Sequence, residues 1–246
     1  MPGKFLIENE TDSEAQAFAG LSLPLVRVQR VLNLALDLLY PPRCVGCDRV
    51  DTVWCDRCQS QLADIPVVLH RQNPFSYLAT AATAIHQDKA QSAVQALKYA
   101  SARPLAIALA QRIVQAYQQL NWEVDLVVPV PMHTDRLKKR GYNQAALIAR
   151  AMAEQCDLPY SENAILRQRF TRSQVGLTRV ERQANMIDAF IADTNQCSQK
   201  QILLIDDVLT TGATLGGCAE TLLNAGANAV FGLTVTTARL DPETRG

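Results

Sequence analysis

Short apolar runs alternate with amphipathic segments along most of the chain. Nearly continuous apolar runs bounded by polar residues predict strands over residues 77–85, 124–130, 164–166, 202–205 and 229–236. Apolar positions spaced three or four residues apart predict helices over residues 21–40, 88–99, 105–120, 143–155 and 178–187, and another after residue 212. Strands alternating with helices are typical of an α/β protein with a mostly parallel sheet. We expect this domain over residues 75–240.

The segment 201–214 joins a predicted strand to an unusual turn. Its four apolar residues, 202–205, are followed by two acids and a run of small or hydroxylic residues: Asp206, Asp207, Thr210, Thr211, Gly212, Ala213 and Thr214. Hydroxyl groups and free N–H groups at a helix N-terminus favour a phosphate. The carboxylates should face sugar hydroxyls, a divalent metal, or both. A buried strand entering a helix would explain the apolar run equally well, but not the residues after it.

Other nucleotide-binding motifs are excluded by the sequence. Neither the P-loop pattern GxxxxGK[ST] nor the dinucleotide pattern GxGxxG occurs in the chain.

Four cysteines form a CxxC-x7-CxxC pattern: Cys44, Cys47, Cys55 and Cys58. Two such pairs supply the four thiolates of a tetrahedral structural Zn²⁺ site. Two disulfides or a redox pair are the alternatives. We expect a small unit over residues 21–66 that consists of an amphipathic helix and this zinc ribbon.

Charge is balanced overall but unevenly distributed. The 246-residue chain has 24 Lys or Arg and 24 Asp or Glu, so no global field attracts nucleic acid or membrane. Ten of the bases nevertheless lie within residues 136–182. Together with the predicted phosphate turn, this stretch suggests a polyanionic ligand, with a solvated basic face as the alternative.

The N-terminal region indicates a cytoplasmic protein without membrane insertion. Residues 1–20 are acidic and lack the apolar core of a signal peptide, so we expect a disordered tail. The apolar segment 21–40 is interrupted by Arg27, Arg30 and Asp37, which argues against a membrane span. In a reducing compartment, clustered cysteines favour metal over disulfides.

Residues 202–214 resemble the phosphoribosyl diphosphate (PRPP) motif of type I phosphoribosyltransferases. The chain combines this motif with the cysteine ribbon after Tyr40-Pro41-Pro42 and with the basic segment 129–144. That combination resembles the ComF (GntX-like) family over about residues 40–239. The resemblance implies a type I phosphoribosyltransferase fold preceded by a zinc ribbon.

The resemblance also implies roles for individual residues. Asp206 and Asp207 would be the catalytic acids that engage the ribose hydroxyls, through Mg²⁺ or directly. The turn Thr210, Thr211, Gly212, Ala213 and Thr214 would hold the 5-phosphate. The pyrophosphate would meet Arg136, Lys138 and Arg140, and a mobile flap over residues 170–182 would bring Arg172, Gln174, Arg179 and Arg182. Lys98 matches a recurrent family position, for which the sequence suggests no role.

Three functions are compatible with these features. The first is a ComF-type PRPP-binding protein associated with DNA uptake in natural transformation, with single-stranded DNA, a competence helicase and recombination mediators as partners. The second is a conventional phosphoribosyltransferase that transfers ribose 5-phosphate to a nucleobase or amine. The third is a single-stranded DNA-binding module with a non-catalytic PRPP sensor site. Site chemistry predicts PRPP binding in all three and leaves enzymatic activity open.

Overall fold

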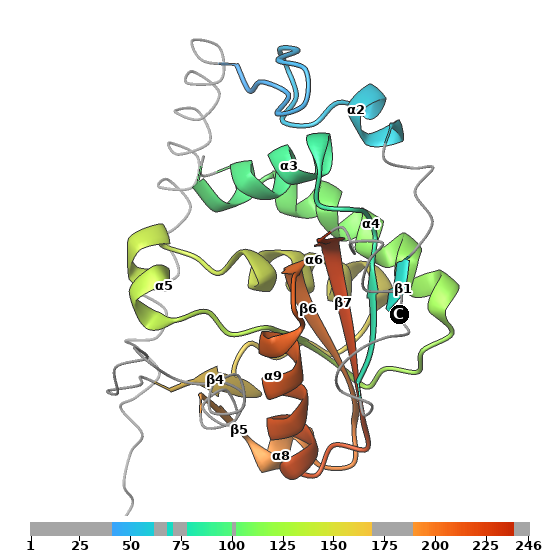
Figure 1. Ribbon diagram of the computed structural model, residues 1–246, viewed down its shortest axis with the longest axis vertical. Helices are drawn as coiled ribbons and strands as arrows, with labels where there is room; N and C mark the ends of the chain where they lie inside the picture. Colours follow the sequence, from blue (N-terminus) through green and yellow to red (C-terminus); the bar gives the residue numbers. More distant parts are fainter. Residues whose placement is uncertain (1–40, 62–67, 71–77, 100–101, 169–188, 239–246) are drawn as a thin grey trace, which may run out of the picture.

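The computed structural model describes residues 41–61, 68–70, 78–99, 102–168 and 189–238 (Figure 1). The expected tail, the helices over 21–40 and 178–187, and the flap lie outside these residues.

A five-stranded sheet forms the centre of the fold. Its strands, in spatial order, are β1 (Val68–His70), β2 (Leu78–Ala82), β7 (Ala229–Thr237), β6 (Gln201–Leu209) and β3 (Leu126–Pro129). Only β1 pairs antiparallel to its neighbour within this sheet; the other four strands are parallel. The expected α/β class with a mostly parallel sheet is confirmed.

Helices cover both faces of the sheet (Figure 1). One face packs against α3 (Asp88–Tyr99), α4 (Leu105–Leu120) and α6 (Gln144–Cys156). The other face packs against α9 (Ala213–Asn224), the antiparallel pair β4 (Ile165–Arg167) and β5 (Phe190–Ala192), and the short α8 (Thr194–Cys197).

Strand β6 contributes to both cores, because successive side chains of a strand point to opposite faces. Leu203 and Ile205 belong to the α3–α4–α6 core, whereas Ile202 and Leu204 belong to the α9 core. This alternation explains why residues 202–205 are all apolar.

Several features differ from the sequence prediction, among them β1, β5 and α8, which lie in segments for which no element was predicted. Strand β6 continues past the apolar run to Leu209, because β7 pairs with it as far as Thr237. A seven-residue helix, α5 (Thr134–Arg140), occupies a segment for which no element was predicted. None of its residues is buried, so it has no apolar pattern to reveal it.

The cysteine ribbon packs directly on the main domain. It contains the bridge between Arg43 and Val50 and the short helix α2 (Asp56–Ser60). Trp54 and three of the cysteines are buried in the same core as the inner face of α3. Over the described ranges, no helix has the length and apolar character needed to cross a membrane.

Candidate functional site

The four predicted metal ligands converge in the ribbon. Their sulfur atoms all lie within 4.8 Å of one another. The Sγ atom of Cys55 is 3.7 Å from that of Cys44 and 3.6 Å from that of Cys47. A tetrahedral zinc site with Zn–S bonds of about 2.3 Å requires sulfurs about 3.8 Å apart. The cluster could therefore hold a metal ion of this kind.

The ribbon's electrostatics also favour a cation. Burial opposes ionisation of Cys44, but hydrogen bonds from the backbone N–H groups of Cys55 and Gly46 and from neighbouring thiols lower its pKa to about 6. Burial and the neighbouring thiols raise the pKa of Cys58 to about 12. Cys58 thus needs a nearby positive charge to become a thiolate.

Gly46 permits the close approach of the two cysteine pairs. A Cβ atom at this position would lie 2.9 Å from the Sγ atom of Cys58 and 3.5 Å from the Cδ atom of Lys89 in α3. Any side chain at Gly46 would therefore displace a ligand sulfur.

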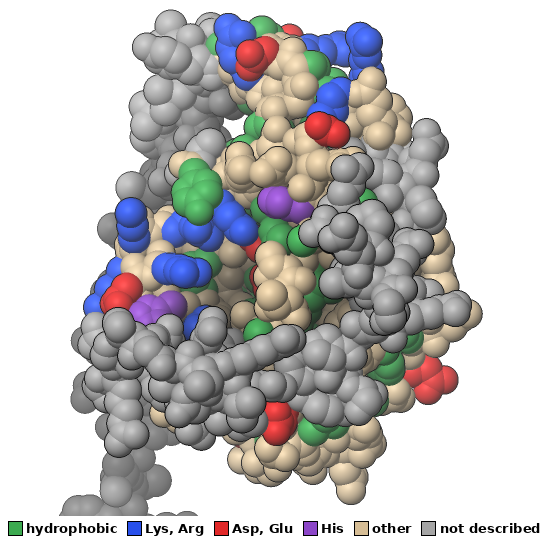
Figure 2. All heavy atoms as spheres, in the orientation of Figure 1, with side chains coloured by type: hydrophobic (Ala, Val, Ile, Leu, Met, Phe, Trp, Pro, Cys, Tyr) green, Lys and Arg blue, Asp and Glu red, His purple; other side chains and the backbone are tan. Residues whose placement is uncertain are grey.

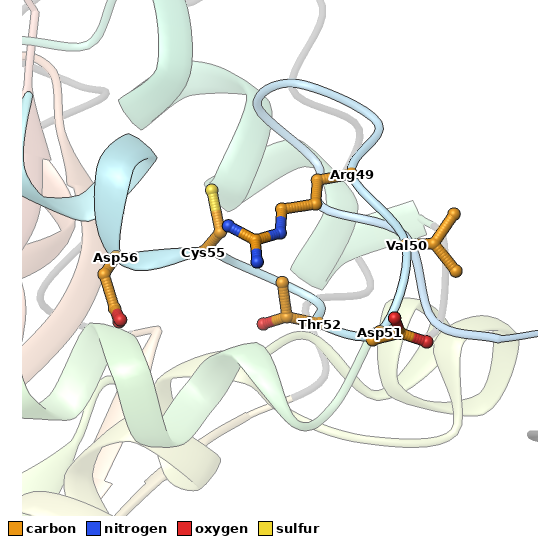
Figure 3. Close-up of a pocket in the computed structure, with 6 residues that line it drawn as sticks. All are labelled: Arg49, Val50, Asp51, Thr52, Cys55 and Asp56. Carbon is orange, nitrogen blue, oxygen red and sulfur yellow. The ribbon is translucent and has the colours of Figure 1, made fainter.

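A pocket of about 190 Å³ lies on the ribbon, away from the PRPP-like motif. Figure 3 shows its lining, with the Arg49 guanidinium extending toward Cys55. Asp51 and Asp56 supply the opposite charge, so the lining favours neither anions nor cations. The pocket is therefore not suited to a highly charged ligand such as PRPP.

Asp206 and Asp207 lie within β6 and differ sharply in environment. Strand β3 pairs with β6 only as far as Ile205, so both acids lie beyond the carboxyl end of β3. That sheet edge is where open α/β folds bind ligands. Because side chains alternate, Asp207 continues the face of Leu203 and Ile205, and Asp206 continues the face covered by α9.

Asp206 is close to Cys218 of α9 and to its neighbouring acid. Burial and the charge of Asp207 raise the pKa of Asp206 to about 8. One of its carboxylate oxygens accepts a hydrogen bond of 2.8 Å from the backbone N–H of Asp207. Asp206 should therefore be largely protonated at neutral pH in the ligand-free protein.

Asp207 is paired with Lys98 from the last turn of α3. The Nζ atom of Lys98 lies 2.9 Å from the Oδ2 atom of Asp207. The sequence marked Lys98 only as a recurrent family position and did not indicate that it would contact Asp207. The structure thus supplies a contact that the sequence did not predict.

His86 also belongs to this group. Thr236 donates its hydroxyl proton to the backbone oxygen of Asp207 at 3.2 Å. The 2.8 Å contact between His86 Nδ1 and Thr236 Oγ1 must then be donated by the ring. Burial and the positive charge of Lys98 lower the pKa of His86, which therefore favours its neutral form.

The predicted phosphate turn leads directly into α9. Gly212 caps the helix with φ of 74°, in the left-handed region that glycine adopts readily. Thr211 accepts a hydrogen bond from the N–H of Ala213 at 3.4 Å. Thr210 and Thr211 are exposed. The turn therefore has the accessible hydroxyls and helix N-terminus that suit a phosphate.

The basic segment forms α5, which follows the edge strand β3 along the chain and lies at the left of the molecule in Figure 1. Arg136 and Lys138 are exposed, and basic side chains are gathered on this part of the surface (Figure 2). Arg140 contacts Gln144 and stacks over Tyr99, with its guanidinium carbon 5.3 Å from the ring centroid. The flap residues Arg172, Gln174, Arg179 and Arg182 lie outside the described residues.

Curated proteins similar to this chain are named for competence or for DNA utilization. Competence protein F from Haemophilus influenzae is 32% identical over 108 residues, which cover 43% of this chain and 47% of that protein. DNA utilization protein YhgH from Escherichia coli is 25% identical over 194 residues, which cover 76% of this chain and 85% of that protein. The expected resemblance to ComF proteins is confirmed. Competence protein ComFC from Bacillus subtilis is 36% identical to this ComF-like chain over 103 residues, or 41% of the chain and 39% of ComFC.

No family model matches the ComF-like chain. Among solved structures, glutamine PRPP amidotransferase from B. subtilis gives a TM-score of 0.39 at 18% identity, covering 52% of this chain and 25% of that one. Trypanosoma cruzi hypoxanthine phosphoribosyltransferase gives a TM-score of 0.34 at 15% identity, covering 56% of this chain and 65% of that one. Likenesses this weak support no role for this chain.

Proposed function

We propose that this chain is a ComF-type PRPP-binding protein that acts in the handling of DNA taken up by the cell. The observation that carries the proposal is the β6–turn–α9 unit, which joins an acid pair to an accessible phosphate-binding turn. Relatives named for competence and DNA utilization support the DNA-related role.

In this proposal the turn Thr210–Thr214 holds the 5-phosphate, and Asp206 and Asp207 engage the ribose hydroxyls or a Mg²⁺ ion. Arg136, Lys138 and Arg140 meet the pyrophosphate, joined by the flap residues Arg172, Gln174, Arg179 and Arg182. The ribbon would hold a structural Zn²⁺, because its four cysteines can supply all four ligands of a tetrahedral shell and leave no position open for catalysis.

Mg²⁺ would supply positive charge on the leaving pyrophosphate if phosphoribosyl transfer occurs. The chain itself would hold the sugar by its carboxylates and 5-phosphate turn, and would stabilise the developing negative charge with Arg136, Lys138 and Arg140. The donor set fits the ion, because carboxylate oxygens are ligands that Mg²⁺ prefers.

Calorimetry with PRPP and Mg²⁺ tests the site. We expect Asp206→Asn combined with Asp207→Asn to weaken PRPP binding by about tenfold or more, because charge-assisted hydrogen bonds are lost. Glu154→Gln, an exposed acid on α6, is the control and should bind as the parent does. Parental affinity in the double variant would show that these acids do not bind the ligand.

The conventional transferase is distinguished by its product. Pyrophosphate released from PRPP in the presence of one nucleobase or amine, and not without it, would identify the acceptor and favour an enzyme. PRPP binding without any release of pyrophosphate in the presence of bases, amines or DNA would favour the sensor function.

A DNA contact is supported by one exposed aromatic side chain. Tyr99 is 78% exposed and lies beside α5, against Arg140. Aromatic rings next to basic residues provide stacking positions for the bases of single-stranded DNA. We propose this surface as its contact, in the cytoplasm, where a competence helicase and recombination mediators would be the protein partners.

Fluorescence anisotropy with a labelled oligonucleotide tests this contact. Binding should weaken steeply with salt, because phosphate contacts release counterions. Tyr99→Ala should weaken binding by about 1 kcal/mol or more through lost stacking. Exposed Ile107→Ala on α4 is the control. An absence of binding at low salt would remove DNA as a direct ligand of the isolated chain.

A further inference from the structure

We propose that Lys98 is a positioning residue of the ligand site, which fixes the Asp207 carboxylate and supplies the charge that balances it before the ligand arrives. The inference rests on the proposed PRPP site and deepens it, because it assigns the acid pair a resident cation from a different element.

The contact is close and largely shielded from water. Lys98 Nζ lies 2.9 Å from Asp207 Oδ2, and the two side chains are 21% and 6% exposed. Within the described part of the chain, Lys98 is the only cationic group within ion-pair distance of Asp207. A buried carboxylate beside a second acid is costly unless a cation is near, so removing Lys98 would leave Asp207 uncompensated.

The backbone that carries Lys98 is held independently of the ion pair. Ala93, Val94 and Leu97 pack α3 into the core, and the backbone oxygen of Leu97 accepts a hydrogen bond from the Tyr142 hydroxyl. Lys98 therefore projects from a fixed helix end. Apolar packing already joins α3 to the sheet, and buried ion pairs contribute little net stability. A role limited to attaching the helix does not account for this pair.

The surroundings of Asp207 leave Lys98 a specific task. The backbone oxygen of Asp207 is held by Thr236, which in turn is held by His86. Its Oδ2 atom is buried and has no well-aligned hydrogen bond from any described group. The charge of Lys98 is therefore what compensates and fixes this buried carboxylate oxygen.

A double-mutant cycle tests this positioning role. PRPP affinity with Mg²⁺ is measured by calorimetry for the parent, Lys98→Met, Asp207→Asn and the combined variant. If Lys98 acts through Asp207, Lys98→Met should weaken binding about tenfold in the parent, as for the loss of a contact to a charged group. In the Asp207→Asn background the same change should cost less than about twofold, because coupled residues are not additive.

Two further variants separate positioning from folding. Lys98→Arg should retain affinity close to that of the parent, because it restores the charge. Lys89→Met, at the other end of α3, should bind as the parent does. If Lys98→Met does not fold, Lys98→Gln replaces it in the cycle.

Three results would overturn the inference, and they differ from one another. Parental affinity of Lys98→Met, while Asp207→Asn is weakened, would show that the ion pair is dispensable. Equal losses in both backgrounds would show that Lys98 acts on the ligand or the fold and not through Asp207. A parent protein that binds no PRPP would overturn the proposed function and, with it, this inference.

Discussion

Two neighbouring acids in this chain have different physical situations because a strand turns successive side chains to opposite faces. Asp207 faces α3 and is paired with Lys98, whereas Asp206 faces α9 and has a raised pKa. The sequence alone suggests two equivalent carboxylates. The strand geometry places one beside a lysine and the other where burial and the neighbouring acid raise its pKa.

Asp206 should make stability depend on pH. Burial and the Asp207 charge raise its pKa from 3.8 to about 8, so the folded protein retains this proton where the unfolded chain has lost it. Stability from this group is therefore full below about pH 4 and declines as pH rises toward about 8. We expect the ligand-free protein to lose free energy of unfolding between pH 5 and pH 8.5, and Asp206→Asn to lose less. Urea unfolding at both pH values measures this loss. An equal loss of free energy of unfolding in the parent and in Asp206→Asn would contradict the assignment.

At the scale of elements, helix α6 is tied to the end of β3 by its N-cap residue. Asn143 accepts a hydrogen bond from the N–H of Ala145 and donates one to the backbone oxygen of Val130, both at 3.0 Å. Asn143 is thus the N-cap of α6, and its second hydrogen bond fixes the start of α6 relative to the segment before α5.

Asn143→Ala should destabilise the protein by about 1–3 kcal/mol, because it removes the cap and leaves buried groups unpaired. Asn143→Asp should cost less, since it keeps the acceptor for Ala145 and loses only the bond to Val130. Chemical denaturation compares the three proteins. A change below about 0.5 kcal/mol for the alanine variant would contradict the role of this cap.

At the scale of the whole molecule, the cysteine ribbon and the sheet are connected through α3. The ribbon's buried cysteines and Trp54 share a core with the inner face of this helix. The other end of α3 carries Lys98 to Asp207. Metal binding in the ribbon should therefore also stabilise the sheet domain.

Two tryptophans allow this coupling to be measured. Trp54 lies in the ribbon, and Trp122 stacks on Phe231 of β7 at a centroid distance of 4.9 Å. Structural zinc contributes on the order of 10 kcal/mol to the folding free energy of small domains, so its loss should destabilise the sheet domain as well as the ribbon. With Trp54→Phe as background, we expect Cys44→Ser or chelation to lower the thermal midpoint reported by Trp122.

Cys156→Ser, which changes a thiol outside the cluster, is the control and should keep the parental zinc content. A Trp122 transition that is insensitive to zinc would mean that the ribbon and the sheet unfold independently.

Local patterns in the sequence were enough to predict the α/β class, the bounds of α3 and α4, the turn into α9 and the four cysteines as a possible metal cluster. These features depend on residues that are close along the chain, where periodicity and spacing directly reflect backbone geometry. Helix α5 was missed because none of its residues is buried. The full length of β6 was missed because its last residues, which include the two acids, form a strand by pairing with β7 and not by being apolar.

Only the tertiary structure decided which distant residues meet. Lys98 and Asp207 lie on different elements and pair across the domain, and no local pattern indicates that Lys98 contacts this acid. The seating of the ribbon on α3 and the separation of the two acids likewise follow from packing on the two faces of the sheet. Charge, burial and distance become defined at these contacts only when the chain has folded.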